Sequence, residues 1–367
     1  MRHISGENPQ PQTSTTNLSR LPSLDGWRAV SILMVLGFHS TFAAGFPVGL
    51  KPPFFDLIFN GDLGVRFFFT ISGFLITWLV VLELDQNGSV NLKHFYARRC
   101  LRIFPVYFTF LGVLAGLHLF ASTGQSVASW IGNLTFTRNF VAGSASSEHL
   151  WSLSVEEQFY LIWPTALLLS GAGRKLRTAM LILGAVILLA PVFRGMWITR
   201  LYPEILKPVF CANSFFLRFD SLAFGCLCAI LLAREREWVG EYLKSRSWLV
   251  AILAIALIFF SNFLDPWLII RLGPTLQALG FSILLLQSVI MPDWGFYRGL
   301  NWAWVRQIGV LSYSLYIWQQ LFWSPPESLA LSRVWWMGLW IIPLFSVASV
   351  SYYGIERPFL RLRKRFR

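Results

Sequence analysis

The sequence predicts an all-α protein that crosses a membrane about ten times, with both ends of the chain in the cytosol. Three observations lead to this prediction. Hydrophobic residues make up 55% of the chain and charged residues only 13%, with a mean hydropathy of +0.56. Apolar runs of about 20 residues, the length of a transmembrane helix, recur along the sequence. Lysine and arginine gather in alternate segments between these runs, which is typical of cytosolic loops.

The ten expected helices follow one another through short polar connections. Their approximate ranges are 27–46, 63–82, 101–121, 151–170, 178–197, 209–232, 248–264, 274–291, 308–324 and 334–354. If both ends lie in the cytosol, the cytosolic segments hold 22 of the 31 lysine and arginine residues, and this bias sets the predicted orientation. We therefore expect a multi-pass protein of the inner (plasma) membrane, surrounded by membrane lipids.

Domain organisation follows from the same pattern. Residues 1–20 are polar and rich in Ser, Thr, Asn and Pro, so they are expected to form a disordered cytosolic tail. Residues 21–358 are expected to form one transmembrane domain, and residues 359–367 a basic cytosolic tail. The longest polar segments, around 121–150 and 233–247, are too short for a separate soluble domain.

Charge and cysteine content exclude two other classes of function. The formal net charge of +13 would indicate nucleic-acid binding in a soluble domain, but here the basic residues lie between apolar runs, so no nucleic-acid partner is expected. Cys100, Cys211, Cys226 and Cys228 lie in or beside apolar segments without the spacing of metal ligands. We expect them to be buried thiols, and we expect no metal site.

Two ionisable residues share one face of the first expected helix, in the stretch SLDGWRAVSILMVLGFHS. Arg28 and His39 are eleven residues apart, which brings their side chains within about 20° of each other around the helix and separates them by about 16 Å along it. An ionisable group within a membrane is costly and usually functional. His39 therefore suits the role of a general base, and the alternative is that it only hydrogen-bonds another helix.

Two further spans are expected to bring charged residues to the depth of His39. Glu156 and Glu157 follow the start of the fourth span, and at most one of them can face a central cavity because neighbouring residues are about 100° apart. Arg218 and Asp220 lie in the sixth span. A base, a carboxylate and a cation at one level suit a buried reaction chamber, whereas the alternative is an ion pair that only links helices.

A basic cluster precedes the third span, in FYARRCLRIFPVYF. Arg99 and Arg102 are three residues apart and lie on one helical face, and Arg98 comes directly before them. Arginines at the start of a helix can bind phosphate groups through paired hydrogen bonds. The alternative is that the cluster only sets the orientation of the chain in the membrane.

Several of the 17 tryptophans are expected near the membrane interfaces, where indole rings anchor helices. This group consists of Trp302, Trp304, Trp335, Trp336 and Trp340. Trp151 lies beside the start of the helix that carries Glu156, and we expect it to contact a substrate instead.

Five motifs occur along the chain in a characteristic order. They are Arg28 and His39 with ten residues between them, GDLGVRFFFTISGFL from Gly61, Arg99 and Arg102 followed by Pro105 and Tyr107, WSLSVEEQFYLIWP from Trp151, and IERPFLRL from Ile355. Through these motifs the sequence from Leu21 to Leu362 resembles the acyltransferase-3 family of integral-membrane O-acyltransferases.

The resemblance implies an enzyme that takes an acyl group, most commonly acetyl, from cytosolic acyl-coenzyme A (acyl-CoA). The group would be placed on a hydroxyl of a sugar in a cell-surface glycan or glycolipid. His39 and Glu156 would be catalytic. The residues implied to bind the donor are Arg28, Arg98, Arg99 and Arg102, and those expected to contact the acceptor are Trp151, Glu157, Arg218, Asp220 and Gln319.

Two features differ from many relatives. In LSYSLYIWQQLFW, Gln319 stands where many relatives have a histidine, which argues against a proton relay through this helix, although Gln319 can orient an acceptor by hydrogen bonds. Some relatives carry an appended periplasmic esterase-like domain, whereas this sequence ends at Arg367. We therefore expect that the membrane domain acts alone or that a separate periplasmic protein completes the transfer.

The residues leave three alternatives open. His39 either deprotonates the acceptor hydroxyl for direct transfer, oriented by Glu156, or carries the acyl group in a covalent intermediate. An acyltransferase that acts on a small lipid or secondary metabolite would use the same motifs. A membrane transporter of a sugar or organic anion would use the same buried charges as a binding site.

Overall fold

The computed structural model describes residues 21–42, 54–169, 176–201, 213–323 and 340–366, apart from positions 22, 122 and 142, together with residues 52 and 203. This part of the chain contains helices and no strand, which confirms the all-α prediction. The α-helices of eight residues or more are α1 Leu24–Ser40, α3 Gly61–Asn87, α4 Leu92–Phe120, α5 Val127–Leu134, α6 Leu150–Leu169, α7 Leu176–Thr199, α8 Phe215–Arg234, α9 Arg236–Ser245, α10 Ser247–Phe260, α11 Pro266–Ile290, α13 Ala303–Trp318 and α15 Ile341–Ser351.

Shorter helical segments connect these elements. They are α2 Phe55–Ile58, η2 Arg138–Phe140, η3 Ala145–Ser147, η5 Ser261–Phe263, α12 Tyr297–Leu300, α14 Gln320–Trp323, the π-helix η7 Tyr352–Glu356, α16 Arg357–Leu362 and η8 Arg363–Phe366. The predicted tail of residues 1–20 lies outside the described residues.

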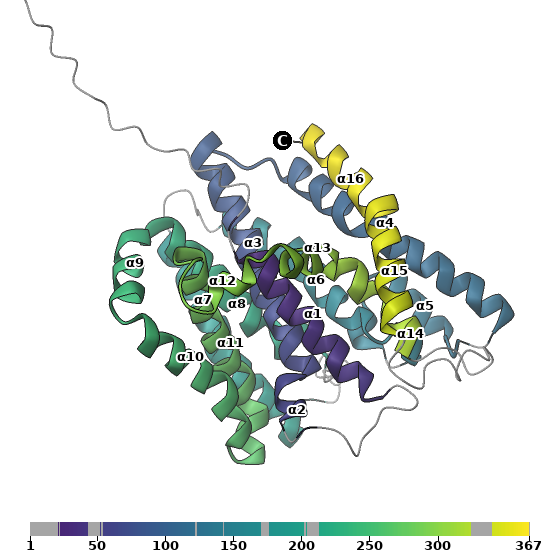
Figure 1. Cartoon of the computed structure of the whole chain (residues 1–367), viewed down its shortest axis with the longest axis horizontal. Helices are drawn as coiled ribbons and strands as arrows, with labels where there is room; N and C mark the ends of the chain where they lie inside the picture. The colour runs from purple at the N-terminus through teal and green to yellow at the C-terminus, as the bar shows by residue number, and fades with distance from the viewer. Residues whose placement is uncertain are drawn as a thin grey trace, which may run out of the picture.

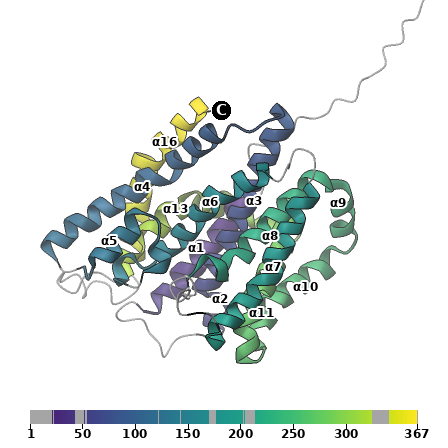
Figure 2. The same ribbon diagram turned by 180° about the vertical axis from the view of Figure 1, so that it is seen from behind.

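Helices α1 and α3 lie between two groups of helices (Figure 1). One group consists of α7 to α11 and the other of α4, α6, α13, α15 and α16, and the view from behind gives the same arrangement (Figure 2). Two hydrophobic cores fill the bundle, and α1, α3 and α8 contribute side chains to both. These three helices therefore join the two halves of the protein.

Asparagine side chains determine where two of the functional helices begin. The side chain of Asn60 accepts a hydrogen bond from the Leu63 backbone N–H (2.9 Å), and Asn91 accepts one from His94 (3.1 Å). An asparagine cap satisfies a backbone donor that the helix itself cannot pair. The caps thus set the starts of α3 and α4, and with them the positions of the charged residues in the first turns.

Glycines allow α3 and α8 to pack backbone against backbone. A Cβ atom at Gly73 would overlap the backbone of Leu222, and one at Gly225 would overlap the backbone of Thr70. Small residues at such crossings let transmembrane helices approach closely. Gly309 performs the same role between α13 and the backbone of Asp25, just inside the start of α1.

Five helical segments of the described residues are long and apolar enough to cross a membrane. They are Phe55–Asn87, which includes α3, together with α4, α7, α8 and α11. Arg236–Ser245 and Ser247–Phe263 would together make a sixth, but they are bent by 90° at the break between them. The described residues thus support a multi-pass membrane protein, but they do not confirm the predicted number of ten spans.

The other four expected spans differ from the prediction for physical reasons. Helices α1 and α13 have 17 and 16 residues, fewer than the roughly 20 of a typical span, and α15 has 11 residues but continues without a break through η7, α16 and η8 to Phe366. Helix α6 has 20 residues but carries two glutamates. Side chains of α1, α6 and α13 instead line the two chambers of the candidate active site.

Candidate active site

Two chambers lie between the helices and share part of their lining. The first, the arginine chamber, has an empty volume of about 710 Å³ and is lined by residues that include Arg28, Ser72, Arg99, Arg102, Glu156, Tyr160 and Tyr313. The second, the histidine chamber, has an empty volume of about 1080 Å³ and is lined by residues that include His39, Asp62, His149, Trp151, Arg218 and Trp323. Val65 and Tyr316 line both chambers. Arg28 and His39 thus lie in different chambers, one toward each end of α1.

The arginine chamber holds three guanidinium groups from two helices. Arg28 forms a hydrogen-bonded ion pair with Asp25 at 3.3 Å, and the guanidinium of Arg99 lies 4.9 Å from the centre of the Tyr160 ring. Within the described part of the chain, no carboxylate forms an ion pair with Arg99 or Arg102. Their N–H groups are therefore available to a ligand with several negative charges.

His39 is held from two sides in the histidine chamber. Its Nδ1 atom lies 3.0 Å from Oε1 of Gln319, and its ring stacks on Trp323 with a centroid distance of 5.0 Å and an interplanar angle of 4°. With the amide oxygen of Gln319 as acceptor, Nδ1 carries the proton and Nε2 keeps its lone pair. This tautomer is the one that a general base requires.

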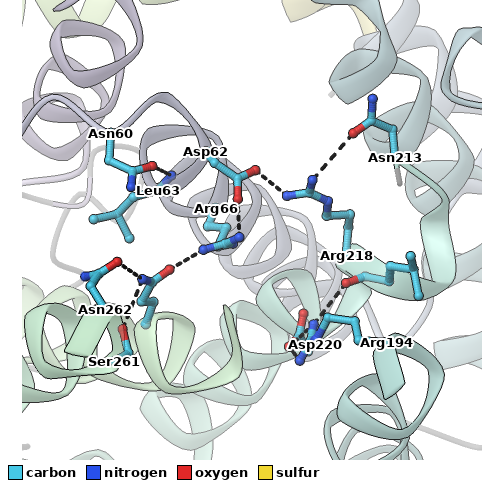
Figure 3. Close-up of polar contacts among 12 residues, drawn as sticks. Asn60, Asp62, Leu63, Arg66, Arg194, Asn213, Arg218, Asp220, Ser261 and Asn262 are labelled. Atoms are coloured by element: carbon cyan, nitrogen blue, oxygen red, sulfur yellow. Dashed lines mark hydrogen bonds and ion pairs between the residues drawn. The ribbon is translucent and has the colours of Figure 1, made fainter. Parts of the chain in front are cut away.

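Arg218 is fixed in the same chamber by several partners. It forms an ion pair with Asp62 and donates a hydrogen bond to Oδ1 of Asn213 at 3.4 Å (Figure 3). Its guanidinium also lies 5.0 Å from the centre of the Trp151 ring. The predicted substrate contacts Arg218 and Trp151 are therefore adjacent in the histidine chamber, where they would face a substrate together.

Asp62 and Arg66 belong to this network, although we did not single them out in the sequence. Asp62 pairs with Arg66 as well as with Arg218, and Arg66 also donates a hydrogen bond to Gln277 of α11 (Figure 3). A signal was present in GDLGVRFFFTISGFL, because two opposite charges four residues apart in an apolar span are neighbours on one face. Asp62 lines the histidine chamber and holds Arg218 in place.

His149 is a second histidine in this chamber that the sequence reasoning missed. Its Nε2 atom lies 3.0 Å from the Ile317 carbonyl oxygen, and because a carbonyl only accepts, Nε2 must carry the proton. Its Nδ1 atom is buried without a hydrogen-bond partner among the described residues. The carbonyl of His149 also accepts a hydrogen bond from the hydroxyl of Tyr316 at 3.0 Å. His149 thus fixes a residue at the boundary of the two chambers.

Glu156 does not share a chamber with His39, so the predicted grouping of this carboxylate with the base is not found. Glu156 lines the arginine chamber and accepts a hydrogen bond from the Ser72 hydroxyl at 2.8 Å, whereas the partner of His39 is Gln319. Helix α1 ends at Ser40, so His39 lies at the very end of its helix, beside the start of α6. Glu156 lies five residues beyond Trp151, about 7.5 Å further along α6.

Glu157 and Asp220, both predicted to contact the acceptor, lie outside the two chambers. Oε1 of Glu157 is buried with no hydrogen-bond partner in the described structure, which agrees with the expectation that only one of the adjacent glutamates faces a cavity. Asp220 is fully buried and pairs with Arg194 at 3.0 Å, and it accepts a hydrogen bond from Thr275 at 2.6 Å. Asp220 therefore links α7, α8 and α11, in agreement with the alternative of an ion pair that only links helices.

Asp220→Ala is expected to lower the free energy of unfolding by about 3–5 kcal/mol, because it leaves the buried Arg194 guanidinium without its partner. Asp85→Ala is the matched control, since its ion pair with Arg234 is exposed, and its expected cost is below about 1 kcal/mol. Equilibrium unfolding in detergent measures both values. Equal costs for the two variants would contradict the assigned role of Asp220.

Arg98, predicted to bind the donor, lies outside the arginine chamber. It donates hydrogen bonds to Glu83 at 2.6 Å and to the backbone carbonyl of Phe366 at 2.7 Å. The ring of Phe366 also contacts His94. Arg98 thus attaches the basic C-terminal segment, which is helical through η8, to α4.

A sequence profile that describes an acyltransferase domain matches residues 21–352. The chain belongs to this acyltransferase family. The resemblance drawn from the five motifs is therefore confirmed. No solved structure matches the chain significantly.

Curated relatives of this acyltransferase match most of its length. It is 27% identical to the peptidoglycan O-acetyltransferase OatA of Listeria monocytogenes, over 94% of this chain and 57% of the relative. It is 25% identical to the putative peptidoglycan O-acetyltransferase YrhL of Bacillus subtilis, over 92% and 54%. It is 26% identical to a putative O-acetyltransferase of Staphylococcus aureus, over 95% and 58%. The chain thus spans little more than half the length of these relatives.

Gln319→Leu in this acyltransferase is expected to lower kcat about tenfold, because the neutral imidazole of His39 loses the acceptor that holds its proton on Nδ1. The KM for the acyl donor is expected to stay within about twofold, since Gln319 lines neither chamber and contacts His39 instead. Steady-state kinetics separates the two constants. A raised KM with an unchanged kcat would instead place Gln319 in donor binding.

Proposed function

We propose that this acyltransferase moves an acyl group, in the first instance acetyl, from cytosolic acyl-CoA to a sugar hydroxyl of a cell-surface glycan. The observation that carries the proposal is the pair of chambers that share Val65 and Tyr316, one lined by three arginines and the other by His39. Such an arrangement suits a donor with several phosphates at one face and a hydroxyl acceptor at the other.

The donor would bind in the arginine chamber. Coenzyme A carries several phosphate groups, and guanidinium groups bind phosphate oxygens through two parallel hydrogen bonds. Arg99 and Arg102 would supply these bonds, with Arg28 beside them. Glu156 lines the same chamber, so its proposed role changes from orienting His39 to balancing and positioning the arginines.

The acceptor would bind in the histidine chamber, where Nε2 of His39 takes the proton of its hydroxyl. The hydroxyl oxygen attacks the carbonyl carbon of the thioester, a C–O bond forms and the C–S bond breaks. His39 then gives the proton to the departing thiolate of coenzyme A, so that it returns to its neutral state. Arg218 is positioned to stabilise the negative charge that develops on the carbonyl oxygen, and Trp151 to contact the sugar.

The acceptor class is supported by the relatives, two of which are named as peptidoglycan O-acetyltransferases or putative ones. We therefore propose a glycan of the cell envelope as acceptor. The protein would then reside in the plasma membrane.

The test is a transfer assay with purified protein in detergent, radiolabelled acetyl-CoA and a peptidoglycan extract. We expect label on the glycan and one free coenzyme A thiol for each acetyl group transferred. Label that accumulates on the protein in the absence of acceptor would instead indicate the covalent route through His39. If acetyl-CoA is neither bound nor consumed, the proposal fails and the transporter alternative takes its place.

A further inference from the structure

The boundary between the two chambers consists of few side chains. Among the residues that line the chambers, only Val65 of α3 and Tyr316 of α13 belong to both linings. The other lining residues, such as Ser72 and His39, belong to one lining each. Among the described residues, Val65 and Tyr316 are thus the side chains that face both chambers.

Both boundary residues are held in place. The Tyr316 hydroxyl forms hydrogen bonds with the Ser152 hydroxyl at 2.5 Å and the His149 carbonyl at 3.0 Å. Val65 follows Gly64, whose missing side chain lets α3 pack against α1, since a Cβ there would lie 2.7 Å from the Ser31 carbonyl oxygen. Val65 and Tyr316 are thus positioned by two packed helices and an anchored ring, and closely packed side chains discriminate among groups by size.

The proposed reaction requires a group to pass this boundary. The arginines that would bind the phosphates of acyl-CoA lie in one chamber, and His39 lies in the other. The acyl group is at the tip of the pantetheine arm, so it must enter the gap first. A longer acyl chain would therefore meet Val65 before its carbonyl carbon reaches the attacking oxygen.

We infer that Val65 and Tyr316 form the passage through which the acyl thioester reaches the acceptor, and that the side chain of Val65 sets the longest acyl group that is transferred. This inference rests on the proposed function and adds to it a determinant of donor specificity. Val65 is the better residue to vary, because its side chain makes no hydrogen bond and its loss leaves the Tyr316 anchor intact.

The test compares acetyl-CoA with butyryl-CoA as donors for wild type, Val65→Ala and Val65→Phe. Each methylene that a pocket accepts or rejects changes kcat/KM by about tenfold or more. Val65→Ala is therefore expected to raise the butyryl-to-acetyl ratio of kcat/KM at least about tenfold. Val65→Phe is expected to lower acetyl transfer at least about tenfold while the Kd for acetyl-CoA stays within about twofold of wild type.

Val80→Ala is the matched control, because Val80 is a fully buried valine of the same helix that lines neither chamber. Its butyryl-to-acetyl ratio of kcat/KM is expected to equal that of wild type. An active Val65→Ala enzyme with an unchanged ratio would overturn the passage and leave the proposed function standing. A wild type that transfers no acyl group from either donor would overturn the proposed function itself.

Discussion

His39→Ala is expected to lower kcat for acyl transfer at least about 100-fold, the loss typical of a missing general base. The donor arginines lie in the other chamber, so the Kd for acetyl-CoA is expected to stay within about twofold of wild type. The hydrogen bond to Gln319 and the stacked ring of Trp323 already hold the imidazole in place before a substrate binds. The measurement is radiolabel transferred to glycan, alongside binding of labelled acetyl-CoA.

His118→Ala is the matched control for this experiment. His118 is an exposed histidine of α4 that hydrogen-bonds Thr123 at 2.8 Å and lines neither chamber. Its removal is expected to leave both kcat and Kd unchanged. If folded His39→Ala protein transferred label as fast as His118→Ala, His39 would be a structural residue and the proposed mechanism would be wrong.

Arg99→Ala and Arg102→Ala are each expected to raise the KM for acyl-CoA about 10- to 100-fold. A hydrogen bond to a charged group contributes about 1.5–3 kcal/mol, and each variant removes at least one such contact with a phosphate. Within the described residues neither arginine forms an ion pair with a carboxylate, so neither substitution breaks one. Steady-state kinetics over a range of acyl-CoA concentrations gives both constants.

Arg234→Ala controls for the loss of a positive charge, because Arg234 pairs with Asp85 on the surface, away from the chambers. Its KM is expected to match that of wild type. High salt is expected to weaken donor binding equally in wild type and Arg234→Ala. In Arg99→Ala and Arg102→Ala the same salt is expected to weaken donor binding less. A KM that rises equally in all three variants would indicate a general charge effect and would count against the arginine chamber as the donor site.

The fold class and the identity of several chamber residues could be predicted from the sequence. Long apolar runs predict membrane helices whatever their packing, and helical geometry alone put Arg28 and His39 on one face of α1. The motif around Trp151 and the pair Arg99 and Arg102 also pointed to residues that line the chambers. These signals are local, so a single sequence contains them.

The chamber that each side chain lines could not be predicted, because it depends on where each helix ends and how it packs. The early end of α1 at Ser40 brings His39 beside Trp151 and leaves Glu156 with the arginines. The partners of buried charges could not be predicted either, because they are tertiary contacts between helices that are distant in sequence. Asp220 pairs with Arg194 of α7, which nothing in the pattern of α8 indicates.

The most direct test is whether transfer runs from one face of the membrane to the other. Purified protein would be reconstituted in vesicles with a glycan acceptor trapped inside and radiolabelled acetyl-CoA, which does not cross lipid, added outside. We expect label on the trapped acceptor with wild type and none with His39→Ala or Arg99→Ala. A second sample has the acceptor outside the vesicles, on the same side as acetyl-CoA. Label that appears only in this second sample would contradict transfer from one face of the membrane to the other.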